Sequence, residues 1–94
     1  MMLTLTDNAA TVIADYVKGS KRRRAGIRIR PDASRSSGML VELAMKPSPG
    51  DAIVEKNGAR VFLDRGVAPY LASKEIDAEI ASGAVNLFVR EKDE

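Results

Sequence analysis

The clearest structural signal in the sequence is a β-hairpin between residues 52 and 64. The stretch reads Ala52-Ile53-Val54-Glu55-Lys56-Asn57-Gly58-Ala59-Arg60-Val61-Phe62-Leu63-Asp64. Asn57 and Gly58 supply the turn, because a two-residue hairpin turn needs positive φ angles that asparagine and glycine adopt most easily. We therefore expect strands over 52–55 and 59–64. Two prolines and Gly50 within 46–51 predict a further turn that leads into the first of them.

The residues before the hairpin predict a short strand and then a helix. Leu3 and Leu5 alternate with a threonine, and the hydroxyl of Thr6 can cap a helix from about Asp7 to Lys18. Gly19 is expected to end this helix in the left-handed conformation. Apolar residues at helical spacing predict a core-facing side; they are Ala9, Ile13, Tyr16 and Val17, flanked by Ala10 and Val12.

Two more strands are expected between the helix and the hairpin. The alternating segment 26–30 places both isoleucines on one face of a sheet and Arg28 and Arg30 on the opposite, solvent-facing side. Residues 39–45 are almost continuously apolar. This composition is typical of a strand buried on both faces, so we expect it to be central in its sheet.

The residues after the hairpin predict a small helix and two closing strands. Pro69 fits the first turn of a helix that ends near Ser73. Segments 76–80 and 85–89 predict the strands, and 91–94 is expected to be a frayed tail. Together these elements predict an α+β, strand-dominated fold in a single domain over residues 1–94.

The composition excludes several kinds of chemistry. The 94 residues contain no cysteine and no histidine, which excludes disulfides, thiolate nucleophiles, imidazole bases and Cys/His metal sites. Fifteen Lys and Arg against 13 Asp and Glu give a net charge of +2. The N-terminus lacks the features of a signal peptide and no apolar run is long enough to cross a bilayer, so we expect a cytoplasmic protein without membrane contact.

Basic residues are concentrated between positions 18 and 35. The candidates for binding an anion are Lys21, Arg22, Arg23, Arg24, Arg28, Arg30 and Arg35. Such a cluster can neutralise phosphates, which makes a small anion- or nucleic-acid-binding module the alternative function. Binding of single strands usually adds aromatic platforms. The four aromatic residues, Tyr16, Phe62, Tyr70 and Phe88, are all expected to face the core, so nucleic acid is not the favoured partner.

No set of residues points to catalysis. Asp77 and Glu79 share one face of a predicted strand and could hold a hard cation or act as an acid/base pair, but amphipathic alternation explains the same pattern. No histidine is present to act as a base for a serine nucleophile, and no Ser-x-x-Lys arrangement occurs. Met39 and Met45 are expected to fill the core rather than bind a soft metal. We therefore do not expect an enzyme.

Three segments resemble the HesB/IscA-like family of A-type iron–sulfur carriers. They are Leu3-Thr4-Leu5-Thr6-Asp7-Asn8-Ala9-Ala10; Ser36-Ser37-Gly38-Met39 followed by Pro47-Ser48-Pro49-Gly50-Asp51; and Gly58-Ala59-Arg60-Val61-Phe62-Leu63-Asp64 running into Ala68-Pro69-Tyr70-Leu71 and Ile76-Asp77. The resemblance covers nearly the whole chain. It implies a fold of mixed β-sheets with an N-terminal helix, and for members of the family an iron or [2Fe–2S] site made by three cysteines, often at a dimer interface.

The resemblance also implies that the ligands of that site are missing here. Ser36 occupies the position of the first family cysteine, with Arg35 before it, and the sequence ends at Glu94 before a Cys-Gly-Cys segment. We therefore expect no cofactor and no metal site. The expected function is that of a non-catalytic binding or accessory module related to iron–sulfur cluster assembly. Its expected partners are iron–sulfur assembly proteins, and a homodimer is compatible with so short a chain.

Overall fold

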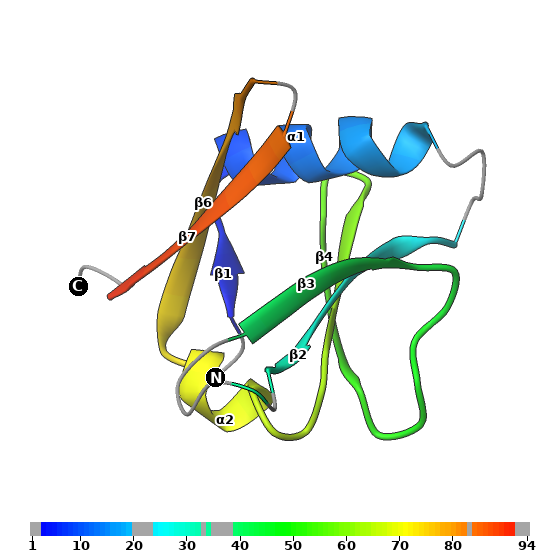
Figure 1. Ribbon diagram of the computed structural model, residues 1–94, viewed down its shortest axis with the longest axis vertical. Coiled ribbons are helices and arrows are strands. Elements are labelled where there is room, and N and C mark those ends of the chain that lie inside the picture. The colour runs from blue at the N-terminus through cyan, green and yellow to red at the C-terminus, as the bar shows by residue number, and fades with distance from the viewer. Residues whose placement is uncertain (1–2, 20–23, 33, 35–38, 83, 92–94) are drawn as a thin grey trace.

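The computed structural model describes residues 3–19, 24–32, 34, 39–82 and 84–91. Its elements in chain order are β1 (Thr4–Leu5), α1 (Asp7–Lys18), β2 (Gly26–Pro31), β3 (Met39–Ala44), β4 (Ala52–Lys56), β5 (Ala59–Leu63), α2 (Ala68–Leu71), β6 (Lys74–Ala81) and β7 (Ala84–Glu91). The strands form one sheet in the order β1-β6-β7 and another in the order β3-β2-β5-β4 (Figure 1). The predicted α+β, strand-dominated class is confirmed.

The hairpin has the predicted strands and turn. Asn57 and Gly58 have φ angles of +49° and +87°, and β4 pairs antiparallel with β5 from Lys56 opposite Ala59 to Ala52 opposite Leu63. Two positive φ angles in a two-residue loop match the right-handed twist of the strands that it joins. The local signal at 52–64 is therefore sufficient to define this part of the fold.

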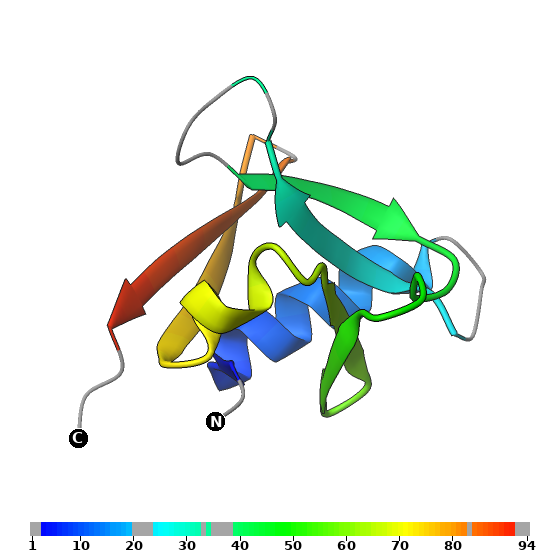
Figure 2. The same ribbon diagram turned by 90° about the horizontal axis from the view of Figure 1, so that it is seen from below.

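Helix α1 begins as the sequence predicts and ends differently. The Thr6 hydroxyl accepts a hydrogen bond from the Ala9 amide at 2.9 Å, which satisfies one of the free amides of the first turn. Gly19 has φ −62° and ψ −20°, so the prediction of a left-handed C-terminal residue is wrong. The chain leaves α1 with right-handed geometry and needs no glycine conformation there. The helix contacts strands of both sheets, β6 more extensively than any other (Figure 2).

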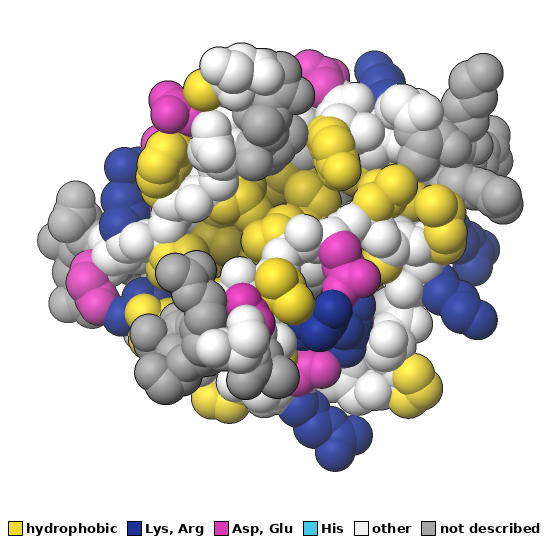
Figure 3. Space-filling model, viewed as in Figure 1, with side chains coloured by type: hydrophobic (Ala, Val, Ile, Leu, Met, Phe, Trp, Pro, Cys, Tyr) yellow, Lys and Arg dark blue, Asp and Glu magenta, His cyan; other side chains and the backbone are white. Residues whose placement is uncertain are grey.

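In the four-stranded sheet the isoleucines of β2 are buried as predicted, but the order of the strands differs from the prediction. Ile27 and Ile29 are buried and lie opposite Leu43 and Val41 in the antiparallel pairing of β2 with β3. On its other side β2 runs parallel to β5. Strand β3 therefore lies at the edge of the sheet, and the prediction that it is central is wrong. Within the described chain β3 forms hydrogen bonds with β2 only, and much of the apolar surface of β3 remains exposed (Figure 3).

The C-terminal part confirms the short helix and both strands. Pro69 lies in the first turn of α2, where its missing amide proton costs no intrahelical hydrogen bond. Strands β6 and β7 pair antiparallel over their full lengths, and β1 adds to β6 in parallel. Glu91 pairs with Lys74 within this ladder, so β7 extends one residue into the segment expected to be frayed; residues 92–94 lie outside the described chain. Neither helix in the described part has the length and apolar character needed to cross a membrane.

The aromatic residues are less buried than the sequence suggests. Phe62 is 0% exposed, but the exposed fractions of Tyr16, Tyr70 and Phe88 are 48%, 58% and 46%. Of the four, Phe62 alone is buried as expected, and it lies on the face of the sheet that carries Arg28 rather than on the face of the main core cluster. Tyr16 lies beside the buried side of α1, and Phe88 lies opposite Asp77, away from the buried Ile76 and Ala78. The hydrophobic periodicity of the sequence was not sufficient to distinguish Tyr16 and Phe88, which lie beside or opposite the buried faces, from core residues.

Candidate functional site

The predicted anion-binding residues are only partly described by the structure. Lys21, Arg22, Arg23 and Arg35, together with Ser36 at the position of the first family cysteine, lie outside the described residues. Arg24 is exposed, and its carbonyl oxygen accepts a hydrogen bond from the Arg60 guanidinium at 3.4 Å. Arg28 and Arg30 both lie on β2, on the face opposite Ile27 and Ile29, as expected. The prediction that this face is open to solvent holds for Arg30 but is wrong for Arg28, whose side chain is only 16% exposed.

Arg28 is the centre of an ion-pair cluster with two aspartates. Its Nε and NH2 atoms lie 3.0 and 3.1 Å from the two carboxylate oxygens of Asp51, and NH2 lies 2.9 Å from Asp64 Oδ2. The backbone amides of Ser48 and Gly66 donate to Asp51 and Asp64. The exposed fractions of the Arg28 and Asp51 side chains are 16% and 2%. This bidentate geometry joins β2 to the turn before β4 and to the end of β5.

The cluster changes the interpretation of Arg28. Its guanidinium already neutralises two carboxylates, and it is largely removed from water. The Arg28 hydrogen bonds, with the amide of Ser48, hold the pKa of Asp51 below its ordinary value, and the same contact with Asp51 raises the pKa of Arg28. Arg28 therefore acts as a structural cross-link of the sheet. Arg30 pairs with Glu42 at a more exposed position on the same face. Binding of an anion by the basic segment remains a prediction.

The Arg28 cluster predicts a loss of stability in acid. The folded-state pKa of Asp51 lies below its ordinary value of 3.8, so the contribution of this pair is complete above that value and is lost as the pH falls through the folded pKa. We expect the free energy of unfolding to decline below about pH 4. Urea titrations at successive pH values measure this decline.

The matched variant for the acid titration is Arg28→Ala. Without the guanidinium, the contribution of Asp51 no longer falls in acid, so the variant should show a shallower decline than the wild type. Some decline remains, because hydrogen bonds from Thr6, the Ala78 amide and Asn8 lower the pKa of Asp77 in the same direction. Parallel declines in the two proteins would contradict the role assigned to Arg28.

Asp77 is a second carboxylate with structural hydrogen bonds. Its Oδ1 accepts a hydrogen bond from the Thr6 hydroxyl at 2.8 Å and from the Ala78 amide at 2.9 Å. The Asn8 amide group also donates to this oxygen, at 3.3 Å, and to the Ala78 carbonyl oxygen. Asp77 therefore fixes the start of α1 on β6. Plain amphipathic alternation, together with this contact, accounts for the Asp77 and Glu79 pattern.

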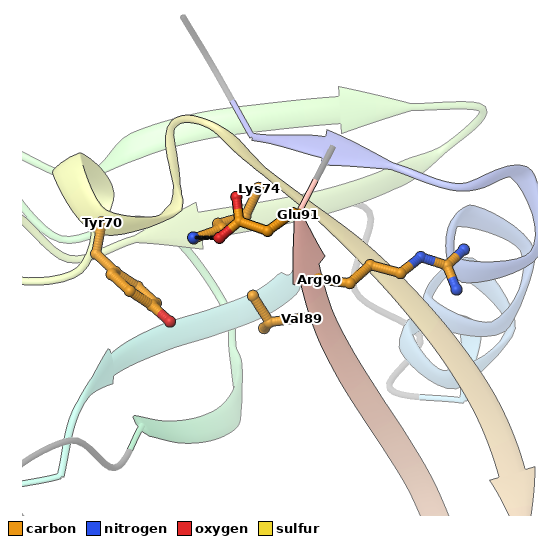
Figure 4. A pocket seen from close by; sticks show the side chains of 5 residues that line it. All are labelled: Tyr70, Lys74, Val89, Arg90 and Glu91. Atoms are coloured by element: carbon orange, nitrogen blue, oxygen red, sulfur yellow. Dashed lines mark hydrogen bonds and ion pairs between the residues drawn. The ribbon is translucent and has the colours of Figure 1, made fainter. Parts of the chain in front are cut away.

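A small surface pocket lies beside α2 and the end of β7. It is lined by Tyr70, Lys74, Val89, Arg90 and Glu91. Figure 4 shows Lys74 between Tyr70 and Glu91, while Arg90 points away. Lys74 forms an ion pair with Glu91, and its Nζ lies 5.1 Å from the Tyr70 ring centre. Arg90 Nε donates to Glu75 at 2.9 Å on the outer face. The opposite charges of Lys74 and Glu91 satisfy each other, so the pocket presents no activated nucleophile or base.

The donor atoms of the chain do not suit an iron–sulfur cluster. Within residues 3–19, 24–32, 34, 39–82 and 84–91, no group of three or more His, Cys, Asp or Glu is placed to hold a metal ion. Asp51 and Asp64 converge, but both carboxylates accept hydrogen bonds from Arg28. Iron–sulfur clusters are held by thiolates, and the 94 residues contain no cysteine. The fold therefore defines a scaffold without the soft ligands of a cluster site.

Solved structures identify the class of protein with this scaffold. SufA of Escherichia coli, involved in the biosynthesis of iron–sulfur clusters, gives a TM-score of 0.77 at 23% identity, covering 97% of this chain and 86% of SufA. A protein from Aquifex aeolicus gives 0.76 at 20% identity, covering 98% and 93% of the two chains. IscA with a [2Fe–2S] cluster gives 0.62 at 18% identity, covering 96% and 85%. The fold is that of the A-type iron–sulfur carriers.

Curated relatives extend this similarity to the sequence, although no family model matches the chain. An uncharacterised protein of Bradyrhizobium diazoefficiens, blr1755, is 30% identical over 82 residues, which are 85% of this chain and 77% of the relative. An uncharacterised Azotobacter vinelandii protein in the nifU 5′ region is 28% identical over 91 residues, 94% of this chain and 85% of the relative. The chain belongs to the HesB/IscA-like family, as a member without cysteine.

Asp51, Asp64 and Asp77, the three aspartates that make these structural contacts, all lie within the family-like motifs. Asp51 ends the Pro-Gly-Asp turn, Asp64 ends the Gly-x-Arg-Val-x-x-Asp hairpin, and Asp77 ends the Ile-Asp pair. The structure shows that the first two hold Arg28 and the third holds Thr6 and Asn8. These motif residues therefore hold segments of the scaffold together. Their position in the motifs is the signal that could have identified them.

Proposed function

We propose that this protein is a non-catalytic accessory module of iron–sulfur cluster assembly that acts by binding assembly proteins and not by carrying a cluster. One observation supports the proposal above all others. The chain aligns over 97% of its length with the fold of SufA, yet its 94 residues include no cysteine. A serine hydroxyl at position 36 does not replace a thiolate, because its pKa lies far above neutrality and oxygen is a hard ligand.

The retained scaffold contacts favour a role in protein binding over loss of all function. The Arg28 cluster and the Asp77 contact join segments far apart in the chain, and both depend on residues within the family-like motifs. These contacts hold the fold together without a cluster, and an ordered fold can present a binding surface to a partner protein. The expected compartment is the cytoplasm, where iron–sulfur assembly proteins would be available as partners.

Affinity capture from the native cell tests the proposal. The bait should carry a tag free of histidine, because a histidine tag binds metal ions itself. We expect iron–sulfur assembly proteins to be enriched over a capture with the tag alone, and the enrichment to survive nuclease treatment. Deletion of the gene should lower the activity of iron–sulfur enzymes, with recovery on re-expression.

The same capture tests the alternative function, an anion- or nucleic-acid-binding module that uses the basic 21–35 segment. Bound nucleic acid that is lost at raised salt would support the alternative, because phosphate contacts weaken steeply with ionic strength. Recovery of nucleic acid without assembly proteins would overturn the proposed function. Capture of neither, together with unchanged iron–sulfur enzyme activity in the deletion strain, would overturn it as well.

A further inference from the structure

The Asn57-Gly58 turn is chemically reactive as well as structurally important. The carboxamide carbon of an asparagine can be attacked by the backbone amide nitrogen of the residue that follows it. A glycine in the following position hinders this approach least, because it has no Cβ. Apart from the chain neighbours of Gly58, no heavy atom of the described chain lies within 4 Å of the position that a Cβ would take there. The surroundings of the turn are therefore open to the reaction.

The backbone amide of Gly58 lies outside the paired part of the hairpin. Strand β4 ends at Lys56 and β5 begins at Ala59, and these two residues form the last pair of the ladder. Asn57 and Gly58 are both exposed. Exposed ends of this kind open at a lower free energy than paired strands. The Gly58 nitrogen can therefore reach the Asn57 carboxamide when the turn opens, without separation of the two strands.

The two other asparagines of the sequence, Asn8 and Asn86, are held in place by regular structure. The nitrogen that would attack Asn8 is that of Ala9, and it donates to the Thr6 hydroxyl at 2.9 Å. The Asn8 carboxamide itself donates to a carboxylate on β6. Asn86 lies within β7, which pairs with β6 over its whole length. Asn57 is thus the asparagine at which the reaction meets least resistance.

We propose that Asn57 is a site of spontaneous deamidation. The Gly58 nitrogen forms a bond to Asn57 Cγ, the bond from Cγ to Nδ2 breaks, and the amide proton leaves with Nδ2 as ammonia. Water then opens the resulting succinimide at either carbonyl group, which leaves aspartate or isoaspartate at position 57. One water molecule enters, one ammonia molecule leaves, and no atom is oxidised or reduced. This inference stands apart from the proposed function, since it requires no assembly protein.

The two products differ in their effect on the hairpin. Aspartate leaves the backbone unchanged, and Asp-Gly suits the same kind of two-residue turn as Asn-Gly. Isoaspartate carries the main chain through its side-chain carbonyl group, which adds one carbon atom to the backbone. The turn must keep Lys56 opposite Ala59, so a longer backbone between them does not fit. Isoaspartate is therefore expected to open the tip of the hairpin.

Lys56 would transmit this change beyond the turn. Its Nζ atom donates to the Leu5 carbonyl oxygen at 2.8 Å and lies 3.0 Å from Asp7 Oδ1. These contacts join the tip of the hairpin to the point where β1 ends and α1 begins. Isoaspartate beside Lys56 would displace them, so a reaction at the surface would also loosen the N-terminal segment.

Peptide mapping by mass spectrometry tests the site. The folded protein should be aged in a mildly alkaline buffer and then digested. We expect the peptide with Asn57 to gain the mass difference between an amide and a carboxylic acid, while the peptides with Asn8 and Asn86 stay unchanged. An isoaspartyl methyltransferase should transfer a methyl group from S-adenosylmethionine to the aged protein and not to the fresh one. No mass change at position 57, or equal changes at all three asparagines, would overturn the proposal.

Two variants separate the effects of the reaction on stability. Asn57→Gly cannot deamidate, and Gly-Gly also suits the turn. Asn57→Asp carries the new charge without the additional backbone atom. We expect the urea midpoint of the wild type to fall on ageing, that of Asn57→Gly to stay unchanged, and that of fresh Asn57→Asp to lie close to the fresh wild type. Equal falls on ageing in the wild type and Asn57→Gly, or an isoaspartate form as stable as the fresh protein, would overturn the proposal.

Discussion

Replacing Phe62 by alanine is expected to lower the free energy of unfolding by about 3–5 kcal/mol. Phe62 is 0% exposed and lies on β5 beside Arg28 of β2 and Ile53 of β4. Its removal would leave a cavity in a small domain whose total stability is of the order of 5–15 kcal/mol. Urea unfolding followed by circular dichroism measures the difference, and complete loss of the folded state would be the extreme form of the same result.

Phe88→Ala is the matched control for this experiment. The same side chain is removed from a position that is 46% exposed, so we expect a loss of about 1 kcal/mol. Because both variants replace phenylalanine by alanine, the difference between their losses of stability reports the difference in burial of the two side chains. Equal losses for the two variants would mean that Phe62 is not the packed centre of its face of the sheet.

Arg28→Ala is expected to cost about 3 kcal/mol, because it leaves the Asp51 carboxylate without its partner. The Asp51 side chain is 2% exposed, whereas Asp64, at 33%, can turn to water when the guanidinium is lost. The control is Arg30→Ala, which removes an ion pair whose two side chains are 42% and 48% exposed. Such a pair is worth about 0–1 kcal/mol. Urea unfolding at neutral pH and moderate salt measures both variants.

The stability losses of the Arg28→Ala and Arg30→Ala variants also test whether Arg28 is a structural residue or a candidate for anion binding. They lie two residues apart on one strand, and the sequence offers no reason to treat them differently. A large loss for Arg28 and a small one for Arg30 would remove Arg28 from the candidates for anion binding and make it part of the scaffold. Equal small losses would contradict the structural role and return Arg28 to the anion-binding set.

Local signals predicted the parts of the fold that depend on neighbouring residues. The Asn57-Gly58 turn, the Thr6 cap and the Ile27 and Ile29 alternation each depend on a few adjacent positions, and each is found in the structure. The place of β3 could not be predicted in this way. An apolar run indicates burial, but which strand is central depends on pairings between distant segments, and here β5 occupies the second side of β2.

The same distinction applies to the candidate site. The alternation of β2 predicted the face of Arg28, but its partners lie 23 and 36 positions away, where no spacing rule reaches. Asp51 and Asp64 both lie in the family-like motifs, but the motifs alone do not indicate that the two residues pair with Arg28. Most of the basic segment lies outside the described residues, so its prediction rests on composition alone.

Anaerobic reconstitution with ferrous iron and sulfide tests most directly whether the scaffold can hold a cluster. The untagged protein should be desalted after incubation and assayed for visible absorption, iron and acid-labile sulfide, with IscA treated in parallel as the positive control. Since no thiolate is present in the 94 residues, we expect the metal and colour to be removed on desalting, whereas IscA retains both. Stoichiometric iron and sulfide that remain with this protein would contradict the account.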